Sequence, residues 1–132
     1  MVSEKKVVIV TGGLSGIGAA VVQRFAADGI CVVAADIAAK ETELEGCAQV
    51  SPFHVDVTNP TSVAKLADAV ARVHGHLDFL VHSAGIGRVA AFLETDLADF
   101  DKIMAVNVRG TFLVGQACAA LMRKGGRGSI VN

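Results

Sequence analysis

A glycine-rich segment near the start of the chain joins an apolar run to an amphipathic one. The run 7–10 predicts a buried strand, and the pattern over 16–28 predicts a helix. Gly12, Gly16 and Gly18 fall in and just after the turn between them. Glycines let backbone N–H groups approach a pyrophosphate, and the positive end of the following helix dipole favours the anion. The segment therefore predicts a dinucleotide phosphate site; the alternative is a tight turn that binds no ligand.

An acidic residue ends the second apolar run. The run 30–35 predicts another buried strand, and Asp36 follows it at close to the ~20-residue spacing expected after such glycines. A carboxylate there accepts hydrogen bonds from ribose hydroxyls and repels a 2′-phosphate. Ser15 and Ile37 are uncharged, although Lys40 is not far along the chain. We therefore expect NAD(H) rather than NADP(H), with a solvated acid at a strand end as the alternative.

Strands and helices alternate along the rest of the chain. The patterns predict strands near 6–11, 30–35, 50–55, 77–82 and 128–132, and helices near 16–28, 61–74, 96–106 and 108–123, with a short turn of helix near 38–45. This alternation predicts an α/β fold with a doubly wound parallel sheet in the strand order 3-2-1-4-5. The ligand crevice then lies over the switch point between the first and fourth strands. A hydrophobic content of 52% fits strands buried on both faces.

The glycine spacing Thr-Gly-x-x-x-Gly-x-Gly is followed by further motifs in a definite order. They are Asp56-Val57, His82-Ser83-Ala84-Gly85, Asn107-Val108-Arg109-Gly110 and Gly128-Ser129-Ile130-Val131-Asn132. Together they resemble the short-chain dehydrogenase/reductase family along the whole chain. The resemblance implies that residues 1–132 form an NAD(P)-binding Rossmann domain. It also implies an oxidoreductase that interconverts a hydroxyl and a carbonyl group.

The resemblance assigns a role to each motif. Asp56 and its neighbour Val57 look like the family's adenine-binding pair, and Asn107 looks like its active-site asparagine. An asparagine also has poor helix propensity, so we expect Asn107 to serve a kink or a hydrogen-bond network. His82 and Ser83 replace the usual asparagine pair; we expect cofactor binding to survive this change, with His82 reaching Thr11 or a backbone carbonyl. The candidate cofactor-binding residues are Gly12, Ser15, Gly16, Ile17, Gly18, Asp36, Asp56, Val57, Ser83, Ala84 and Gly85, and the candidate catalytic residue is Asn107.

The sequence contains no tyrosine. In the family, a catalytic serine follows the fifth strand, and a Tyr-x-x-x-Lys pair lies on the next helix. The resemblance therefore implies that the chain is the family's N-terminal portion, ending just before these groups and inactive by itself. The substrate, an alcohol or ketone in the full-length enzyme, is not readable from the sequence. The alternatives are a truncated non-catalytic nucleotide-binding or interaction protein and, with little support, an unrelated Rossmann-like protein such as a methyltransferase.

Charge and hydropathy bear on partners and location. The net charge of −1 gives no reason to expect nucleic acid or an anionic membrane as partner. Residues 1–6 and the short apolar run behind them do not form a signal peptide, and 111–122 is too short to span a bilayer. Cys31, Cys47 and Cys118 lack metal-ligand or redox spacing. We therefore expect reduced cysteines, no metal site and a cytoplasmic location.

The predicted helix 108–123 is apolar around much of its circumference. Such a helix must be buried on more than one side. One side can pack on the sheet, and the other resembles the family's dimer-forming helix. We therefore expect a symmetric homo-oligomer, a dimer or a tetramer, while burial within the chain's own domain stays an open alternative.

Overall fold

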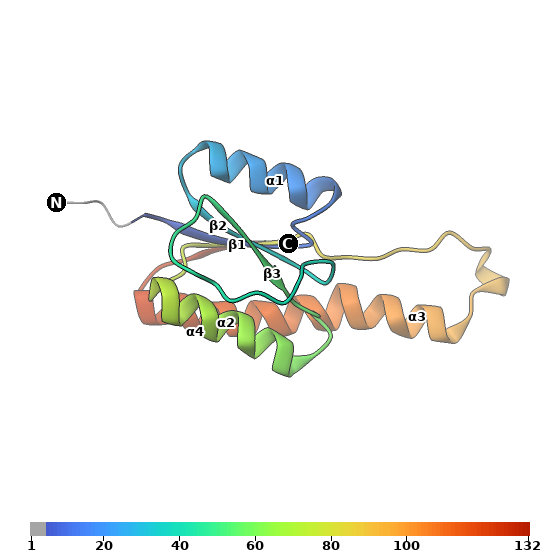
Figure 1. Cartoon of the computed structure of the whole chain (residues 1–132). Coiled ribbons are helices and arrows are strands. Elements are labelled where there is room, and N and C mark those ends of the chain that lie inside the picture. Colours follow the sequence, from blue (N-terminus) through green and yellow to red (C-terminus); the bar gives the residue numbers. More distant parts are fainter. Residues whose placement is uncertain (1–4) are drawn as a thin grey trace.

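A computed structural model describes residues 5–132, which form a parallel sheet with helices on both faces (Figure 1). The strands are β1 (Val7–Thr11), β2 (Cys31–Asp36), β3 (Val50–His54), β4 (Phe79–His82) and β5 (Ser129–Val131). Their order is β3-β2-β1-β4-β5, so the predicted doubly wound topology is confirmed. The expectation that no signal peptide begins the chain falls mainly on residues 1–4, which lie outside the described residues.

The central strands β1 and β2 alternate their side chains between two hydrophobic layers. Val8 and Val10 pack with Val22 of α1 (Gly16–Ala27) on one face. Val7 and Ile9 face the other layer, formed by α2 (Pro60–His74) and α4 (Thr111–Gly125). Figure 1 shows α1 above the sheet and α2 and α4 below it. Burial on both faces explains why these strands read as continuous apolar runs.

Helix α2 has well-defined signals at both ends. The Asn59 side chain accepts hydrogen bonds from the backbone N–H groups of Thr61 and Ser62, and Pro60 occupies the first turn. Such a cap typically contributes about 1 kcal/mol. At the other end Gly75 adopts the left-handed conformation with φ of 74°, the usual helix terminator. The capped start fixes the end of the loop 55–59, which leads from β3 to the helix.

The predicted helices 96–106 and 108–123 are one continuous helix, so the predicted boundary at Asn107 was wrong. α3 (Leu97–Met104) runs through a π-helical turn, η2 (Ala105–Gly110), directly into α4. Asn107, a poor helix former, lies in this wider turn, and the Thr111 hydroxyl donates to the Asn107 carbonyl at 2.7 Å. π-turns inside α-helices are frequent at functional sites. The expected kink at Asn107 therefore takes the form of a widened turn.

The continuous helix also corrects the estimate of membrane-spanning length. Leu97–Gly125 has 29 residues and is long and apolar enough to cross a membrane by length and composition alone. The stretch 111–122 seemed too short because the sequence predicts two separate helices, over 96–106 and 108–123. This is weak evidence for a membrane, because the core helix of a folded domain can pass the same test.

The connection between β2 and β3 departs from the prediction in two ways. No helix forms near 38–45, where the chain makes one turn and then has no regular secondary structure. Cys31 and Cys47 form a disulfide with their Cα atoms 5.6 Å apart, so the expectation of reduced cysteines was wrong for this pair. The cause is the topology: Val50 lies opposite Val32, which returns Cys47 to the start of β2.

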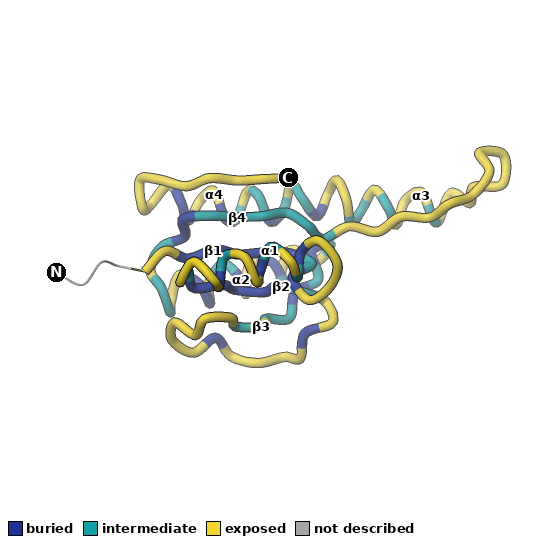
Figure 2. Tube along the Cα trace, turned by 90° about the horizontal axis from the view of Figure 1, so that it is seen from above, coloured by how far each residue is buried: buried dark blue, intermediate teal, exposed yellow. Residues whose placement is uncertain are grey.

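Two parts of the structure are exposed despite their apolar side chains. The segment after β4 extends away from the body and turns back at the short helix η1 (Phe92–Glu94), as Figure 2 shows. Phe92 is 91% exposed there. At the sheet edge, Ile130 and Val131 of β5 are also exposed, as expected for a hydrophobic edge strand.

Candidate cofactor-binding site

The carboxyl ends of β1, β2 and β4 border a cleft of about 440 Å³. It is lined by Gly12, Ser15, Gly16, Ile17, Ala35, Asp36, Ile37, Val55, Asp56, Val57, Ser83, Ala84, Gly85, Ile86 and Val106. Every predicted cofactor-binding residue except Gly18 lines this cleft. Its position over the switch between β1 and β4 is where doubly wound sheets bind ligands.

Close backbone approaches require glycine at positions 12 and 18 of the first turn. Gly12 has φ of 64°, and a Cβ there would lie 2.9 Å from backbone atoms of Ala84. A Cβ on Gly18 would overlap the carbonyl oxygen of Gly12. Gly18 therefore lies under the turn and lets α1 pack against it, while Gly16 faces open space. Ser15 precedes α1 in an extended conformation, and its side chain makes no capping bond to the helix.

Asp36 ties the end of β2 to the glycine turn. One carboxylate oxygen accepts from the Leu14 N–H at 3.1 Å, and the other accepts from the Ala38 N–H at 3.0 Å. Each oxygen keeps lone-pair capacity for a second donor. Among the described residues that line the cleft, Asp36 and Asp56 are acidic and none is basic.

Asp56 lies between two cavities and also braces its own loop. Its carboxylate accepts from the backbone N–H and the hydroxyl of Thr58, at 2.9 and 2.7 Å, and its own N–H donates to the Ser62 hydroxyl.

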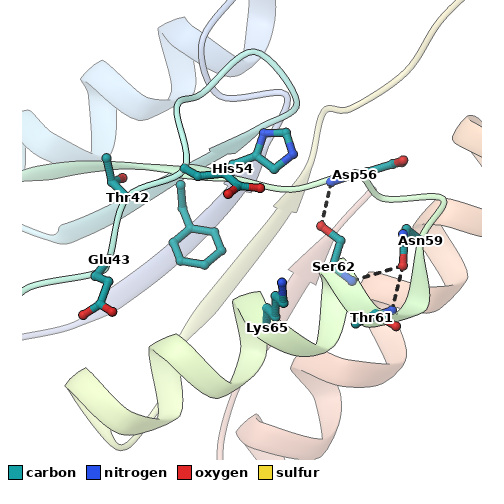
Figure 3. Close-up of a pocket in the computed structure, with 10 residues that line it drawn as sticks. Thr42, Glu43, His54, Asp56, Asn59, Thr61, Ser62 and Lys65 are labelled. Carbon is teal, nitrogen blue, oxygen red and sulfur yellow. Dashed lines mark hydrogen bonds between the residues drawn. The ribbon is translucent and has the colours of Figure 1, made fainter.

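A second cavity, of about 630 Å³, lies beyond Asp56 between β3 and α2 (Figure 3). His54 on this side hydrogen-bonds the Ala39 carbonyl through Nδ1 at 3.0 Å. Val57 follows Asp56 and packs close to Gly110.

Thr11 is the polar centre beneath the turn that follows β4. Its side chain is fully buried, and its hydroxyl oxygen accepts from the backbone N–H groups of Ser83 and Ala84, both at 3.2 Å. His82 Nδ1 lies 3.4 Å from the same hydroxyl, which confirms the predicted contact. Burial lowers the pKa of His82, so the imidazole is neutral at pH 7.

Asn107 holds the far side of the same turn. Its side-chain oxygen accepts from the Ile86 N–H at 2.8 Å, and its side-chain nitrogen donates to the Ile86 carbonyl at 2.8 Å. The structure thus joins Thr11, Asn107 and the segment 83–86 in one hydrogen-bonded unit. The sequence predicted Thr11 as a partner of His82, but it predicted neither the bonds of Thr11 to the Ser83 and Ala84 N–H groups nor the part of Ile86. A threonine that ends an otherwise apolar buried run was the available signal for Thr11.

With this geometry established, comparison with known proteins identifies the family. The model of the family described as short chain dehydrogenase matches residues 6–132. The chain belongs to this family. The predicted resemblance is therefore confirmed, and short-chain dehydrogenases are oxidoreductases that use nicotinamide cofactors, NAD or NADP.

Curated relatives of this short-chain dehydrogenase come from distant organisms. D-threitol dehydrogenase of Mycolicibacterium smegmatis is 42% identical over 96% of the chain and 51% of its own length. The 3-oxoacyl-[acyl-carrier-protein] reductase FabG of Thermotoga maritima is 36% identical over 98% of the chain and 55% of its own length. The chain therefore spans about half the length of the curated relatives it matches.

Solved structures of short-chain dehydrogenases share the fold. One from Streptomyces avermitilis superposes with a TM-score of 0.85 at 29% identity, over 97% of this chain and 48% of its own. One from Serratia marcescens gives 0.77 at 35% identity, over 95% of this chain and 56% of its own. The Rossmann fold is thus supported independently of the strand order.

Proposed function

We propose that the chain is the cofactor-binding portion of an NAD(H)-dependent short-chain oxidoreductase that interconverts a hydroxyl and a carbonyl group. The observation that carries the proposal is the cleft itself, where the glycine turn, Asp36 and the turn after β4 meet. The glycine turn and the start of α1 would hold the pyrophosphate. Asp36 would accept from the ribose hydroxyls, and Asp56 and Val57 would border the adenine.

The charge of the cleft supports NAD(H) over NADP(H). Arginine or lysine usually accommodates a 2′-phosphate, and the described lining contains neither. Asp36 stands at the end of β2 with both oxygens held by backbone N–H groups, so its charge is fixed in place. Lys40 is exposed and does not line the cleft. A bound 2′-phosphate would therefore meet a carboxylate with no neutralising partner in the cleft.

The test of this proposal is a cofactor titration of the full-length protein. Asp36→Asn removes the charge but keeps an acceptor oxygen, so NAD(H) binding weakens by at most about tenfold and NADP(H) binding improves. Asp28→Asn is the matched control, because Asp28 pairs with Arg24 at the other end of α1 and makes the same charge change. Tighter wild-type binding of NADP(H) than of NAD(H) would overturn the cofactor assignment.

We further propose that residues 1–132 by themselves do not catalyse hydride transfer. The sequence contains no tyrosine to act as the family's general acid, and a positioned acid or base typically supplies ~10²–10⁴ in rate. The experiment expresses residues 1–132 and follows absorbance of the reduced cofactor with a panel of alcohols and ketones. Turnover that Asn107→Ala abolishes would contradict this proposal and reveal chemistry within the chain.

We also propose that the full-length protein is a cytoplasmic homo-oligomer that associates through the helix 108–123. The outer face of this helix exposes apolar side chains: Val108 is 54% exposed and Phe112 is 62% exposed. The Cys31–Cys47 disulfide argues against the cytoplasmic part of this proposal, because disulfides are rare in a reducing compartment. Light scattering is the test, and a monomer at micromolar concentration would contradict the association.

A further inference from the structure

The Thr11 hydroxyl has three hydrogen-bond partners among the described residues. A hydroxyl donates one proton and accepts at two lone pairs. Ala84 donates its N–H to this oxygen, and the Ser83 N–H is shared between this oxygen and the Thr11 carbonyl oxygen, each contact at 3.2 Å, so both groups approach the hydroxyl as donors. The hydroxyl proton therefore points to the remaining partner, His82 Nδ1 at 3.4 Å. For that contact Nδ1 must be the acceptor, so it carries no proton.

The other ring nitrogen then carries the proton of the neutral imidazole. Nε2 is buried and has no hydrogen-bond partner within normal distance among the described residues. It faces α4, where a Cβ on Gly115 would lie 4.0 Å from it. The Thr111 carbonyl raises the pKa of His82 from this side, by less than burial lowers it.

We propose that His82, protonated on Nε2, is a positioning residue that orients the Thr11 hydroxyl and thereby sets the turn 83–86 in the cofactor cleft. With its proton directed at Nδ1, the hydroxyl presents both lone pairs to Ser83 and Ala84. Those two residues and Gly85 line the cleft on the side opposite Asp36. The inference deepens the proposed function and, for its binding consequence, rests on it.

Protonation of His82 reverses the arrangement. A protonated Nδ1 is a donor, so it competes with the Ser83 and Ala84 N–H groups for the same oxygen, and the Thr11 proton loses its acceptor. The groups around the ring are Thr11 on β1, Ser83 in the turn, and Thr111 and Gly115 on α4, none of them charged. One helical turn further, burial raises the pKa of Cys118 to about 12, so its thiol stays neutral.

The direction of the pH effect follows from the lowered pKa. The unfolded chain binds this proton more readily than the folded one, so the contribution to stability is complete above the ordinary value of 6.5. It is lost as the pH falls through the folded pKa, which lies below 6.5. We expect the affinity for NAD(H) to fall over the same acidic range, as the turn loses its support.

The first experiment reads the tautomer of the full-length protein without cofactor. Long-range ¹H–¹⁵N spectra of ¹⁵N-histidine-labelled protein at pH 7.5 assign His82 as the signal that disappears in His82→Asn. We expect the neutral form protonated on Nε2. A proton on Nδ1, or an imidazolium at this pH, would overturn the inference. The tautomer is read from wild-type protein, and the signal that disappears in His82→Leu gives a second assignment if His82→Asn fails to fold.

The second experiment compares His82→Asn with His82→Leu, side chains of nearly the same shape. The amide oxygen can replace Nδ1 as acceptor and the isobutyl group cannot, so the leucine variant should bind NAD(H) about three- to tenfold more weakly. Wild-type affinity should fall on acidification, and the asparagine variant should lack this fall. Equal affinities with identical pH profiles would overturn the inference. Failure of wild-type protein to bind NAD(H) would overturn the proposed function, and the tautomer alone would then decide the role of His82.

Discussion

The two ends of β1 both gather polar groups, but they use them in opposite ways. At the amino end, buried Asp78 accepts from the Val7 N–H at 2.9 Å and from Arg127 Nε at 3.0 Å. These partners lie within the fold and tie three segments together. At the carboxyl end, Thr11 supports a turn whose residues line an open cleft. Similar hydrogen bonds therefore stabilise the fold at one end and shape a binding site at the other.

The largest expected effect is at the carboxyl end, from Gly18→Ala. The new Cβ would overlap the Gly12 carbonyl oxygen, and backbone cannot move aside as a side chain can. We expect a loss of about 3 kcal/mol in the free energy of unfolding, measured by urea denaturation, together with weakened NAD(H) binding. The control is Gly87→Ala, where nothing lies within 4 Å of the added carbon. Equal stability of the two variants would show that the tight turn is absent.

At the amino end, Asp78→Ala should cost about 2–3 kcal/mol, because it leaves the buried Val7 N–H without its acceptor. NAD(H) affinity of the remaining folded protein should not change. Arg127→Ala should cost less than about 1 kcal/mol, since its side chain is 64% exposed. If a substitution at Asp78 lowered the NAD(H) affinity of the folded protein as well as its free energy of unfolding, the distinction between the two ends would fail.

At the carboxyl end, the smaller expected effect is from Asn107→Ala, which removes both hydrogen bonds to Ile86. We expect a loss of about 1–2 kcal/mol in stability and faster hydrogen exchange at the Ile86 amide. Asn107→Asp keeps the acceptor for the Ile86 N–H but loses the donor to the Ile86 carbonyl. The Ile86 amide should therefore exchange more slowly in Asn107→Asp than in Asn107→Ala. Unchanged exchange in Asn107→Ala would show that the helix, rather than this side chain, holds the turn.

The sequence predicted the parts of the fold that depend on local pattern. Buried parallel strands and the glycine turn have strong periodic and conformational signals, so the strand order and most of the cleft followed from them. Asn107 was expected in a kink or hydrogen-bond network, but its low propensity was also read as a helix boundary. The helix continues because the Thr111 hydroxyl satisfies the Asn107 carbonyl in the wider turn.

Contacts between distant segments were harder to predict. The Cys31–Cys47 disulfide depends on how the chain returns from β2 to β3, which no spacing rule describes. The paired bonds between Asn107 and Ile86 likewise need the helix placed against the turn. His82 was expected near Thr11 because both end adjacent strands, and their register places them opposite each other. Such contacts follow from the sequence only once the sheet topology is known.

The central claim is that the carboxyl-end cleft binds NAD(H), and a chemical-shift map tests it most directly. NADH is titrated into ¹⁵N-labelled full-length protein, and amide shifts are followed residue by residue. The account predicts the largest changes in the glycine turn 12–18, at Asp36 and over 83–86, with Asp78 and Arg127 unmoved. Shift changes centred on Asp78 and Arg127, or no shift changes at a large molar excess of NADH, would contradict it.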